Sequence, residues 1–434
     1  MIKTRDIGLS FLLALCLSWG GINLGRSLVS PSIGLDFTQY YVASRMVLDG
    51  EARNIYRTDR YYFDKAAAYG AAIGAADTTA TNAYPPFVAF CLIPIALLPF
   101  KRALLLFGII GLLAAGAGVW AFFANEDSRT RRDFILAGLL ITFSFFPLYY
   151  SLYMGQVNAL LFLCVALVLY FARRGRPWWA GFFIALAALI KIFPGVLILY
   201  FAAKRQFQPV IAAIVSAIVL GAVSLTVCYP SVYVTYVSQV LPRQIEGGAF
   251  WRNQGLGGLF ARLLTENEYV QPLANSPTLA RALAALTGLF VLGAALWLIA
   301  RRNRSAPDDL QFGLLMVATL LALSKSWEYY AVMLLFAYFA ILKRVAYARD
   351  APRAPLLLVF LSFCIWTFVL PQDIDYQKLP HSILMQPLFS AKCLATAMLF
   401  VACMWFLLRP DRFGANIHRS AISPQLVSTD ANRD

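Results

Sequence analysis

The sequence is poor in charged residues and in histidine. Charged residues make up 14% of its 434 positions, whereas soluble proteins carry about a quarter. The chain has two histidines, and its seven cysteines show no CxxC spacing. A zinc site and a disulfide framework are therefore not indicated. A large soluble globular protein is excluded as well, because so few charges leave most of the chain without a water-compatible surface.

Hydrophobic residues make up 60% of the chain, and its mean hydropathy is +0.67. Apolar runs recur along the whole length, so most of the chain lies in the bilayer. We predict an all-α polytopic membrane protein with about 11–13 transmembrane helices, in one domain over residues 1–408 and with a disordered cytoplasmic tail over 409–434. The candidate spans are 7–29, 84–100, 103–124, 134–150, 157–171, 178–201, 210–229, 279–300, 312–323, 330–342, 356–370 and 390–408.

The chain is strongly basic, with 37 Lys and Arg against 22 acidic residues and a formal net charge of +15. The basic residues gather in short segments between the apolar runs, which is the positive-inside pattern of cytoplasmic loops. No nucleic-acid-binding motif accompanies them, so we expect no nucleic acid partner. This topology places three segments on the external side: 30–83, 230–277 and 371–387.

Two apolar runs fit a simple crossing poorly. If 84–100 were a full span, the basic segment 128–133 would lie outside, against the charge rule. The four prolines of 84–100 favour a short re-entrant element instead. The run 178–201 has basic loops at both ends, with Lys191 and Pro194 in its middle, so we predict two half-helices that return to the same side.

The first external segment begins with "GLDFTQYYVASRMVLDG", residues 34–50. Asp is a favoured N-cap residue and Gly50 suits a helix end, so one interpretation is a capped amphipathic helix lying on the membrane surface. Its apolar side would consist of Phe37, Tyr41 and Leu48. A second amphipathic stretch follows at 59–74. Tyr40 lies one turn after Asp36, on the same helical face.

Three polar clusters interrupt apolar surroundings: "LYMGQVNALLF", "FWRNQGLGGLFARL" and "LSKSWEYYAV". Buried amides in a membrane protein are either helix–helix contacts, which is the commoner case, or the lining of a polar cavity. Charges at such places are functional by default, although a structural ion pair between Lys325 and Glu328 is an alternative. By charge topology all three clusters lie on the Asp36 side. We therefore predict a cavity that opens to the outer leaflet.

Lys191, in "ALIKIFPG", stands apart from these clusters. It either extends its amine to a membrane interface or binds a lipid phosphate.

Six segments together resemble one family of membrane enzymes. They are "DFTQYYVASRMVLDG", "YPPFVAFCLIPIALLP", "MGQVNALLF", "AGFFIALAALIKIFPGVL", "NQGLGGLFARL" and "SKSWEYY". In this order they resemble the GT-C superfamily of glycosyltransferases, and most closely glycosyltransferase family 87, which includes polyprenol-phosphate-mannose-dependent α-1,2-mannosyltransferases. Each segment alone is a weak signal. Their shared order from Asp36 to Tyr330 covers most of the chain.

The resemblance implies a GT-C-like bundle and transfer of a sugar from a polyprenyl-phosphate donor to a glycan or glycolipid acceptor, with Asp36 as the catalytic base. The leaving phosphate needs positive groups, for which Lys325, Arg243 and Arg252 are candidates. The other substrate-binding residues expected are Tyr40, Tyr84, Gln156, Asn158, Asn253, Gln254, Trp327, Glu328, Tyr329 and Tyr330.

No Asp-x-Asp stands in the context of a nucleotide-sugar metal site, since "DIDY" matches by letters only. We therefore expect no metal and no cofactor. The expected partners are the donor, the acceptor and membrane lipids. The family implies a bacterial cytoplasmic membrane with the active site facing outward.

The chain departs from the family pattern at two places. Family members read close to "NQS" where this chain has Asn253-Gln254-Gly255, and "SPxSWxHH" where it has "SKSWEYY". Tyr329 and Tyr330 thus stand in place of a histidine pair. Phenols donate hydrogen bonds but carry no positive charge near neutral pH, so Lys325 is a candidate to restore that charge.

Two other functions stay open at this point. Broken helices and intramembrane charge also suit a transporter or flippase for a lipid-linked sugar, although the sequence shows no clear internal repeat. The second is a non-catalytic subunit of envelope assembly, if the missing histidines signal lost activity. Formation of a glycolipid product separates an enzyme from both.

Overall fold

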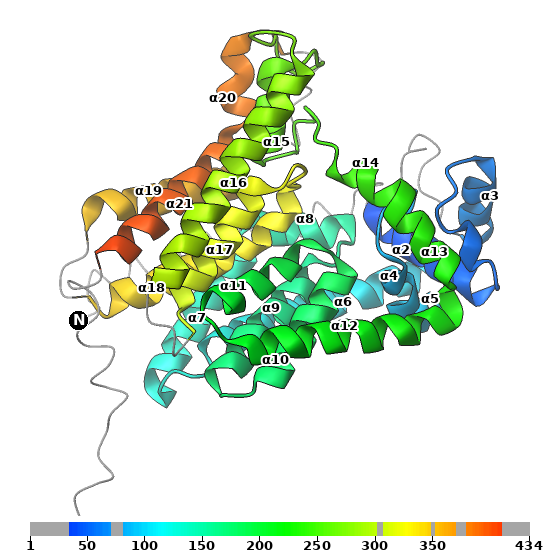
Figure 1. Ribbon diagram of the computed structural model, residues 1–434, viewed down its shortest axis with the longest axis horizontal. Helices are drawn as coiled ribbons and strands as arrows, with labels where there is room; N and C mark the ends of the chain where they lie inside the picture. The colour runs from blue at the N-terminus through cyan, green and yellow to red at the C-terminus, as the bar shows by residue number, and fades with distance from the viewer. Residues whose placement is uncertain (1–33, 71–80, 302–306, 349–351, 370–378, 410–434) are drawn as a thin grey trace, which may run out of the picture.

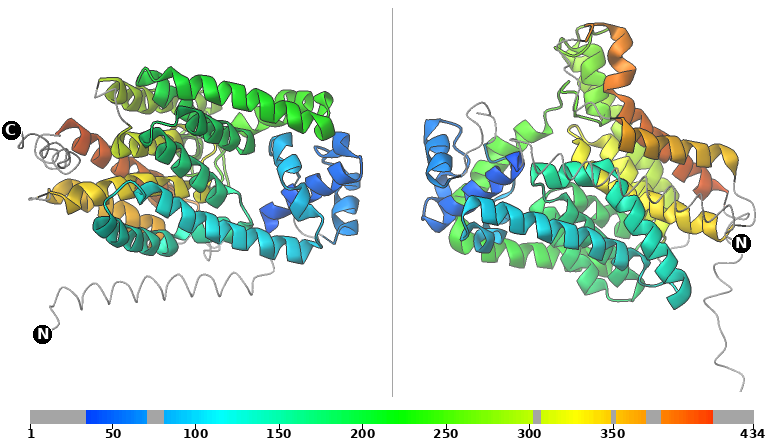
Figure 2. Two further views of the ribbon diagram at one scale, coloured as in Figure 1. Left: turned by 90° about the horizontal axis from the view of Figure 1, so that it is seen from below. Right: turned by 180° about the vertical axis from the view of Figure 1, so that it is seen from behind.

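The computed structural model describes residues 34–70, 81–301, 307–348, 352–369 and 379–409. The expected first span, 7–29, and all but the first residue of the expected tail lie outside these ranges. Across the described ranges the chain is helical, and its β-structure there is one isolated bridge between Asn253 and Trp327. Figures 1 and 2 show α2 and α3 on one side of the molecule and α19 and α21 on the opposite side.

Among the residues that the structure describes, five helices are long and apolar enough to cross a membrane. They are α6 (Phe100–Phe123), α12 (Phe207–Cys228), α16 (Pro277–Arg301), η4 (Glu328–Leu334) continued by α18 (Leu335–Ala346), and α21 (Ala391–Leu408). A sixth crossing results if α7 (Ser128–Ser144) and α8 (Phe146–Met154) act as one span bent by 58°. The predicted all-α polytopic membrane protein is thus confirmed, whereas the full number of spans stays a prediction.

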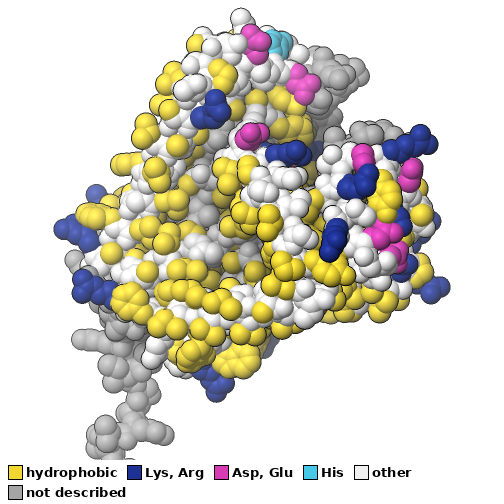
Figure 3. Space-filling model, turned by 45° about the vertical axis from the view of Figure 1, so that its right-hand side comes forward, with side chains coloured by type: hydrophobic (Ala, Val, Ile, Leu, Met, Phe, Trp, Pro, Cys, Tyr) yellow, Lys and Arg dark blue, Asp and Glu magenta, His cyan; other side chains and the backbone are white. Residues whose placement is uncertain are grey.

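Five further apolar helices of the described residues are shorter. They are α9 (Asn158–Arg173), α10 (Pro177–Ile190), η2 (Phe193–Val196) with α11 (Leu197–Ala203), α17 (Asp309–Ala322) and α19 (Arg353–Phe368). In α17, twelve of 14 residues are buried. By contrast, α12 and α16 expose Ile218, Leu289 and Phe290, and Figure 3 shows hydrophobic side chains across the outer surface. The long outer helices therefore present the surface that suits lipid.

The helix breaks predicted from proline and charge are present. After α10 ends at Ile190, the chain turns so sharply that a Cβ on Gly195 would stand 3.6 Å from that of Ala188. The run 178–201 is therefore two half-helices, as expected. The run 84–100 contains only α4 (Pro86–Cys91) and α5 (Ile93–Ala96) before α6 begins, and neither is long enough to span.

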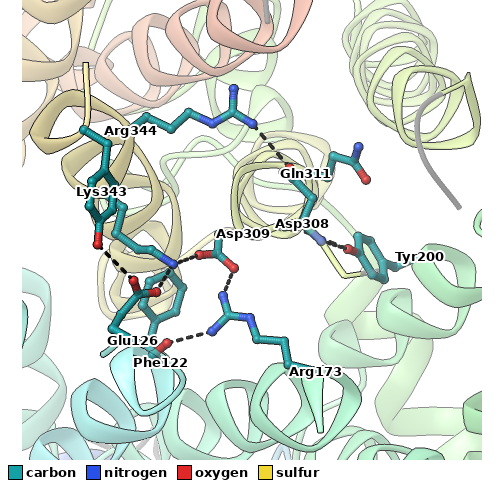
Figure 4. Close-up of polar contacts among 10 residues, drawn as sticks. Phe122, Glu126, Arg173, Tyr200, Asp308, Asp309, Gln311, Lys343 and Arg344 are labelled. Atoms are coloured by element: carbon teal, nitrogen blue, oxygen red, sulfur yellow. Dashed lines mark hydrogen bonds and ion pairs between the residues drawn. The ribbon is translucent and has the colours of Figure 1, made fainter. Parts of the chain in front are cut away.

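A partly buried network of charges ties several helix ends together at one end of the bundle (Figure 4). Lys343 contacts Glu126 and is 2.6 Å from Asp309, which also pairs with Arg173. The Tyr347 hydroxyl donates to Glu126 at 3.3 Å. The loop before α7 therefore lies at the same end as the basic loops that follow α9 and α18. The position of this loop agrees with a re-entrant segment 84–100. The listing of 84–100 as a full transmembrane span is therefore wrong.

The segments predicted to be external are folded into short helices. The first contains α2 (Leu35–Leu48), η1 (Ala52–Asn54) and α3 (Arg60–Ala68). Ten of the 14 residues of α2 are buried among other helices, so the interpretation of a helix lying on the membrane surface is wrong for α2. The second external segment contains α13 (Pro230–Thr235), the π-helix η3 (Tyr236–Val240), α14 (Leu241–Ile245) and α15 (Leu256–Leu264), and the third contains η7 (Ile383–Met385) and α20 (Gln386–Phe389).

The start of α2 and the end of α8 meet through two glycines with positive φ, Gly34 (+78°) and Gly155 (+68°). The Gly34 amide donates to the Tyr153 carbonyl at 2.8 Å. A Cβ on Gly155 would stand 2.5 Å from the Cβ of Phe37 and 3.3 Å from the Cα of Gly34. Only glycine fits this contact, which sets the position of α2 against α8.

We expect Gly155→Ala to destabilise the protein strongly, and Gly175→Ala serves as its control. Both glycines have positive φ, so both changes carry a backbone penalty of roughly 1–2 kcal/mol. A Cβ on Gly175 meets nothing within 4 Å, whereas one on Gly155 overlaps α2. Overpacking should add about 1–3 kcal/mol at Gly155 alone. Thermal unfolding in detergent measures the difference, and equal losses in the two variants would contradict the proposed contact.

Candidate functional site

The side-chain amide of Gln156 is the centre of a polar network between α8 and α9. Its Nε2 donates to Asp36 Oδ2 at 2.5 Å and to the Tyr84 hydroxyl at 2.7 Å. Its Oε1 accepts from the Tyr40 hydroxyl at 2.9 Å and from Lys191 Nζ at 3.3 Å. Because both ends of the amide are used in full, its orientation is fixed. The amide therefore holds Asp36 and Lys191 in one site.

Asp36 is not the N-cap of α2, which corrects the interpretation as a helix cap. Gly34 holds the cap position, and no side chain caps this helix. The half-buried carboxylate instead turns toward α8 and also accepts from Gln39 Nε2 at 3.3 Å. Burial raises the pKa of Asp36, and the Gln156 hydrogen bond and the positive charge of Lys191 oppose this rise. A carboxylate with a raised pKa is a better proton acceptor than an ordinary one.

Lys191 lies at the break between α10 and η2, with its side chain 7% exposed. Its Nζ is 3.9 Å from the ring centre of Tyr330 and 5.1 Å from that of Tyr329. The interpretation of a lysine that extends to the membrane interface is therefore wrong. A helix break at this residue directs the amine inward, toward Gln156 and the tyrosines.

These groups face a cavity of about 540 Å³. Its walls come from α2, the segment before α4, the break after α10, the helices η3 and α14, and the segment that links α17 to η4. Seven residues that the sequence predicts for the site line this cavity: Asp36, Tyr84, Lys191, Lys325, Trp327, Tyr329 and Tyr330. Gln39, Thr81, Phe193, Tyr236 and Gln244 are among the lining residues that were not predicted from the sequence.

Lys325 stands at the rim of the cavity. Its Nζ donates to the backbone carbonyl of Arg243 at 2.6 Å, which links the segment before η4 to α14. The side chain of Arg243 is exposed and is not part of the cavity lining. Lys325 thus supplies a cation at the rim, while Arg243 contributes through its backbone.

Glu328 pairs with Lys392 and Arg252 and not with Lys325, so the alternative of a structural ion pair between Lys325 and Glu328 is wrong. The fully buried Glu328 carboxylate is 2.7 Å from Lys392 Nζ and 3.5 Å from Arg252 Nη1. The guanidinium of Arg252 lies 4.7 Å above the ring of Tyr150. Lys392 was missed, although a lysine inside the last apolar run is the kind of residue that signals a special role. The trio joins the segment 230–277 to η4 and α21.

The side-chain amides of Asn253 and Gln254 form hydrogen bonds with backbone groups, and neither residue lines the cavity. Asn253 Nδ2 donates to the Ser324 carbonyl at 2.8 Å, and its Oδ1 accepts from the Ser326 amide at 2.9 Å. Gln254 donates to the carbonyl of Phe389 and accepts from the amide of Cys393. The Asn253 amide thus positions the segment that carries Lys325 and Trp327, whereas the Gln254 amide ties its own segment to the start of α21. Asn158 is likewise buried, 3.5 Å from Gln156 Oε1, and supports the network from behind.

The arrangement places a proton acceptor and a cation on one cavity. A hydroxyl beside Asp36 can lose its proton to the carboxylate, and an anionic group on the other side can pair with Lys191 or Lys325. The aromatic walls provide apolar surfaces for a ligand that is otherwise polar. This combination suits the transfer of a group to an acceptor hydroxyl from a donor whose leaving group is an anion.

Comparison with known proteins gives two similarities. The sequence model of glycosyltransferase family 87 matches residues 82–324, more than half of the chain. The matched range begins after Asp36 and ends just before Lys325. The chain is also 25% identical over 308 residues to a polyprenol-phosphate-mannose-dependent α-(1-2)-phosphatidylinositol mannoside mannosyltransferase of Mycobacterium tuberculosis. That alignment covers 67% of this chain and 69% of the mycobacterial protein.

A double-mutant cycle on Glu328 and Lys392 tests the buried trio. Glu328→Gln and Lys392→Met should each lower the free energy of unfolding by about 3–5 kcal/mol, because a buried charge loses its partner. Glu328→Gln should cost more, since Arg252 still compensates Glu328 when Lys392 is absent. The double variant should recover much of the loss, and chemical denaturation measures it.

The ion pair of Glu51 with Lys65, at 2.5 Å and about a quarter exposed, is the control cycle. We expect a coupling of only about 0–1 kcal/mol there. A similarly small coupling for Glu328 and Lys392 would show that their proximity carries no structural role.

Proposed function

Because the chain belongs to glycosyltransferase family 87, we propose that it moves a sugar from a polyprenyl-phosphate donor to a lipid-linked or cell-envelope glycan acceptor. The sugar is mannose or another hexose or pentose. The observation that carries the proposal is the placement of Asp36 and Lys191 on one cavity, joined through Gln156. The base can accept the proton of the acceptor hydroxyl, and the cation can pair with the leaving phosphate.

In the proposed reaction, Asp36 takes the proton of an acceptor hydroxyl as that oxygen attacks the anomeric carbon of the donor sugar. The bond between the anomeric carbon and the phosphate oxygen breaks, and its electron pair stays on the phosphate. Lys191 stabilises the negative charge that develops there, with Lys325 at the rim as a second cation. The new glycosidic bond and the free lipid phosphate are the products.

The walls of the cavity support a lipid-linked donor. Leu241 and Ile245 of α14 line the cavity, and Ile245 is also 61% exposed on the outside. Ile192, at the helix break, likewise lines the cavity and is 46% exposed. An isoprenoid chain can therefore leave the cavity along an apolar surface. The mycobacterial relative, by its name, uses a polyprenol-phosphate donor and acts on a phosphatidylinositol mannoside, which supports a glycolipid acceptor here.

The protein is an integral membrane glycosyltransferase, and we propose that the cavity faces outward from a bacterial cytoplasmic membrane. The helix α9 begins two residues after Gln156 and ends at Arg173 in the charged network. A helix of 16 residues spans roughly 24 Å, so the cavity and the basic loops lie at opposite ends. The positive-inside rule then places the basic end in the cytoplasm.

Removal of the base is the first test. Asp36→Asn should lower turnover by about 100-fold or more while the protein still inserts and folds. Asp64→Asn is the control, because Asp64 is an exposed acid on α3 in the same external segment. The assay is thin-layer detection of a glycolipid made by membranes from radiolabelled polyprenyl-phosphate mannose. Full activity in the Asp36 variant would refute a role as base.

Lys191→Met should impair donor use and change the pH profile together. Asp36 must be deprotonated to act, so activity falls as the pH drops through its raised pKa. Lys191 opposes that rise, so its loss should move the acidic limb of kcat/KM to higher pH. The donor KM should also rise.

Lys204→Met is the control for this test, since Lys204 is a buried lysine that hydrogen-bonds Gln311 at the other end of the bundle. It should leave the position of the acidic limb unchanged. If the acidic limb also stays in place in Lys191→Met, Lys191 does not influence the pKa of Asp36.

A further inference from the structure

Three tyrosine rings surround the amine of Lys191. Its Nζ lies 3.9 Å from the ring centre of Tyr330, 5.1 Å from that of Tyr329 and 5.4 Å from that of Tyr84. A cation over the face of an aromatic ring is attracted to it within about 6 Å, so all three rings lie in range. Tyr330 is clearly the nearest of the three, and all four residues line the cavity.

The partners of Lys191 are electrically neutral. Its Nζ donates to Gln156 Oε1 at 3.3 Å, while the Asp36 carboxylate accepts from the other end of that amide. Within the described part of the chain, Lys191 forms no ion pair. By contrast, Lys392 Nζ is 2.7 Å from the Glu328 carboxylate. Of these two buried lysines, one is therefore held by an acid and the other by an amide and aromatic rings.

The difference matters for an anionic ligand. A carboxylate partner cancels the charge of a lysine and competes with an incoming phosphate for its N–H donors. An aromatic ring offsets part of the cost of removing the ammonium from water, but it carries no net charge. An ammonium held by rings is therefore ordered and still available to a phosphate oxygen.

The ring of Tyr330 is itself fixed by contacts on two elements. Its centre is 5.2 Å from that of Phe193, and the two rings are nearly parallel at 19°. Phe193 follows Lys191 by two residues at the helix break, so the break brings both a ring and an amine to Tyr330. Tyr330 also lies two residues after Glu328 on η4, which is tied to Lys392. The ring is thus placed before any ligand enters the cavity.

We propose that Tyr330 is a positioning residue whose ring face holds the Lys191 ammonium at the cavity, ready to pair with the phosphate of the donor. Tyr329 and Tyr84 complete the aromatic surround at longer distances. The face of the ring performs this role, and the hydroxyl is dispensable for it. This inference rests on the proposed function and adds a residue to its phosphate-binding end.

The test changes the electron density of the ring while its shape is kept. Position 330 receives phenylalanine and then its mono-, di- and trifluorinated forms by amber suppression, in the full chain in lipid nanodiscs. Each fluorine withdraws electrons from the ring face and weakens its attraction for a cation. Tyr330→Phe should keep most of the activity. Along the fluorinated series, kcat/KM for the radiolabelled donor should fall stepwise by about tenfold in total, whereas the acceptor KM should not change.

Two controls assign the effect to the contact between the ring and the lysine. In the Lys191→Met background the fluorinated series should be flat, because the ring has no cation to hold. Phe336 on α18 packs against the rings of Phe122 and Phe312, so the same series at Phe336 reports packing and should also be flat. A flat series at position 330, or an equal decline in the Lys191→Met background, would show that Tyr330 only packs and would overturn the inference.

A binding measurement keeps the inference separate from the proposed function. Isothermal titration calorimetry with farnesyl phosphate needs neither a donor sugar nor an acceptor, and its Kd should rise stepwise along the series at position 330. Stepwise weakening of binding in a protein without any transfer activity would support the role of Tyr330 and overturn the proposed function. Transfer activity with a Kd that stays constant along the series would do the reverse.

Discussion

The hydrogen bonds of one side-chain amide hold the candidate site together. Gln156 has four hydrogen-bond partners from three parts of the chain: Asp36 and Tyr40 on α2, Tyr84 before α4, and Lys191 at the helix break. An unpaired amide in this buried position would cost the free energy of its lost water contacts. The network therefore stabilises the fold only when all these segments are in place. The same geometry that satisfies the amide brings the base and the cation together.

The close approach of α2 and α8 makes these hydrogen bonds possible. Gly34 and Gly155 let the two backbones touch, which brings Asp36 within hydrogen-bonding distance of Gln156. The trio of Glu328, Lys392 and Arg252 holds η4, which carries Tyr329 and Tyr330 of the cavity lining, in a similar way, although with charges in place of amides. Charge pairs fix η4 at the cost of desolvation.

Local patterns in the sequence predict the apolar helices, the breaks at Lys191 and in 84–100, and the clusters that surround Asp36. They rest on periodicity, proline and charge, which act over a few residues. The direction of Lys191 and the partner of Glu328 depend on contacts between distant segments. Lys392 lies 64 residues after Glu328, and spacing alone favoured the nearby Lys325. The role of Asn253 was missed for the same reason, since its partners are backbone groups 71 and 73 residues away.

The position of Lys392 has a consequence for the synthesis of the chain. Membrane helices are made in order from the N-terminus, and α21 is the last helix described. Asp36, Gln156 and Lys191 are all present once the chain has passed α11, but Glu328 meets Lys392 only when α21 arrives. Until then a buried carboxylate lacks its nearest cation. A chain cut short before Ala391 keeps that penalty, so an incomplete product is less stable at the wall that closes the cavity.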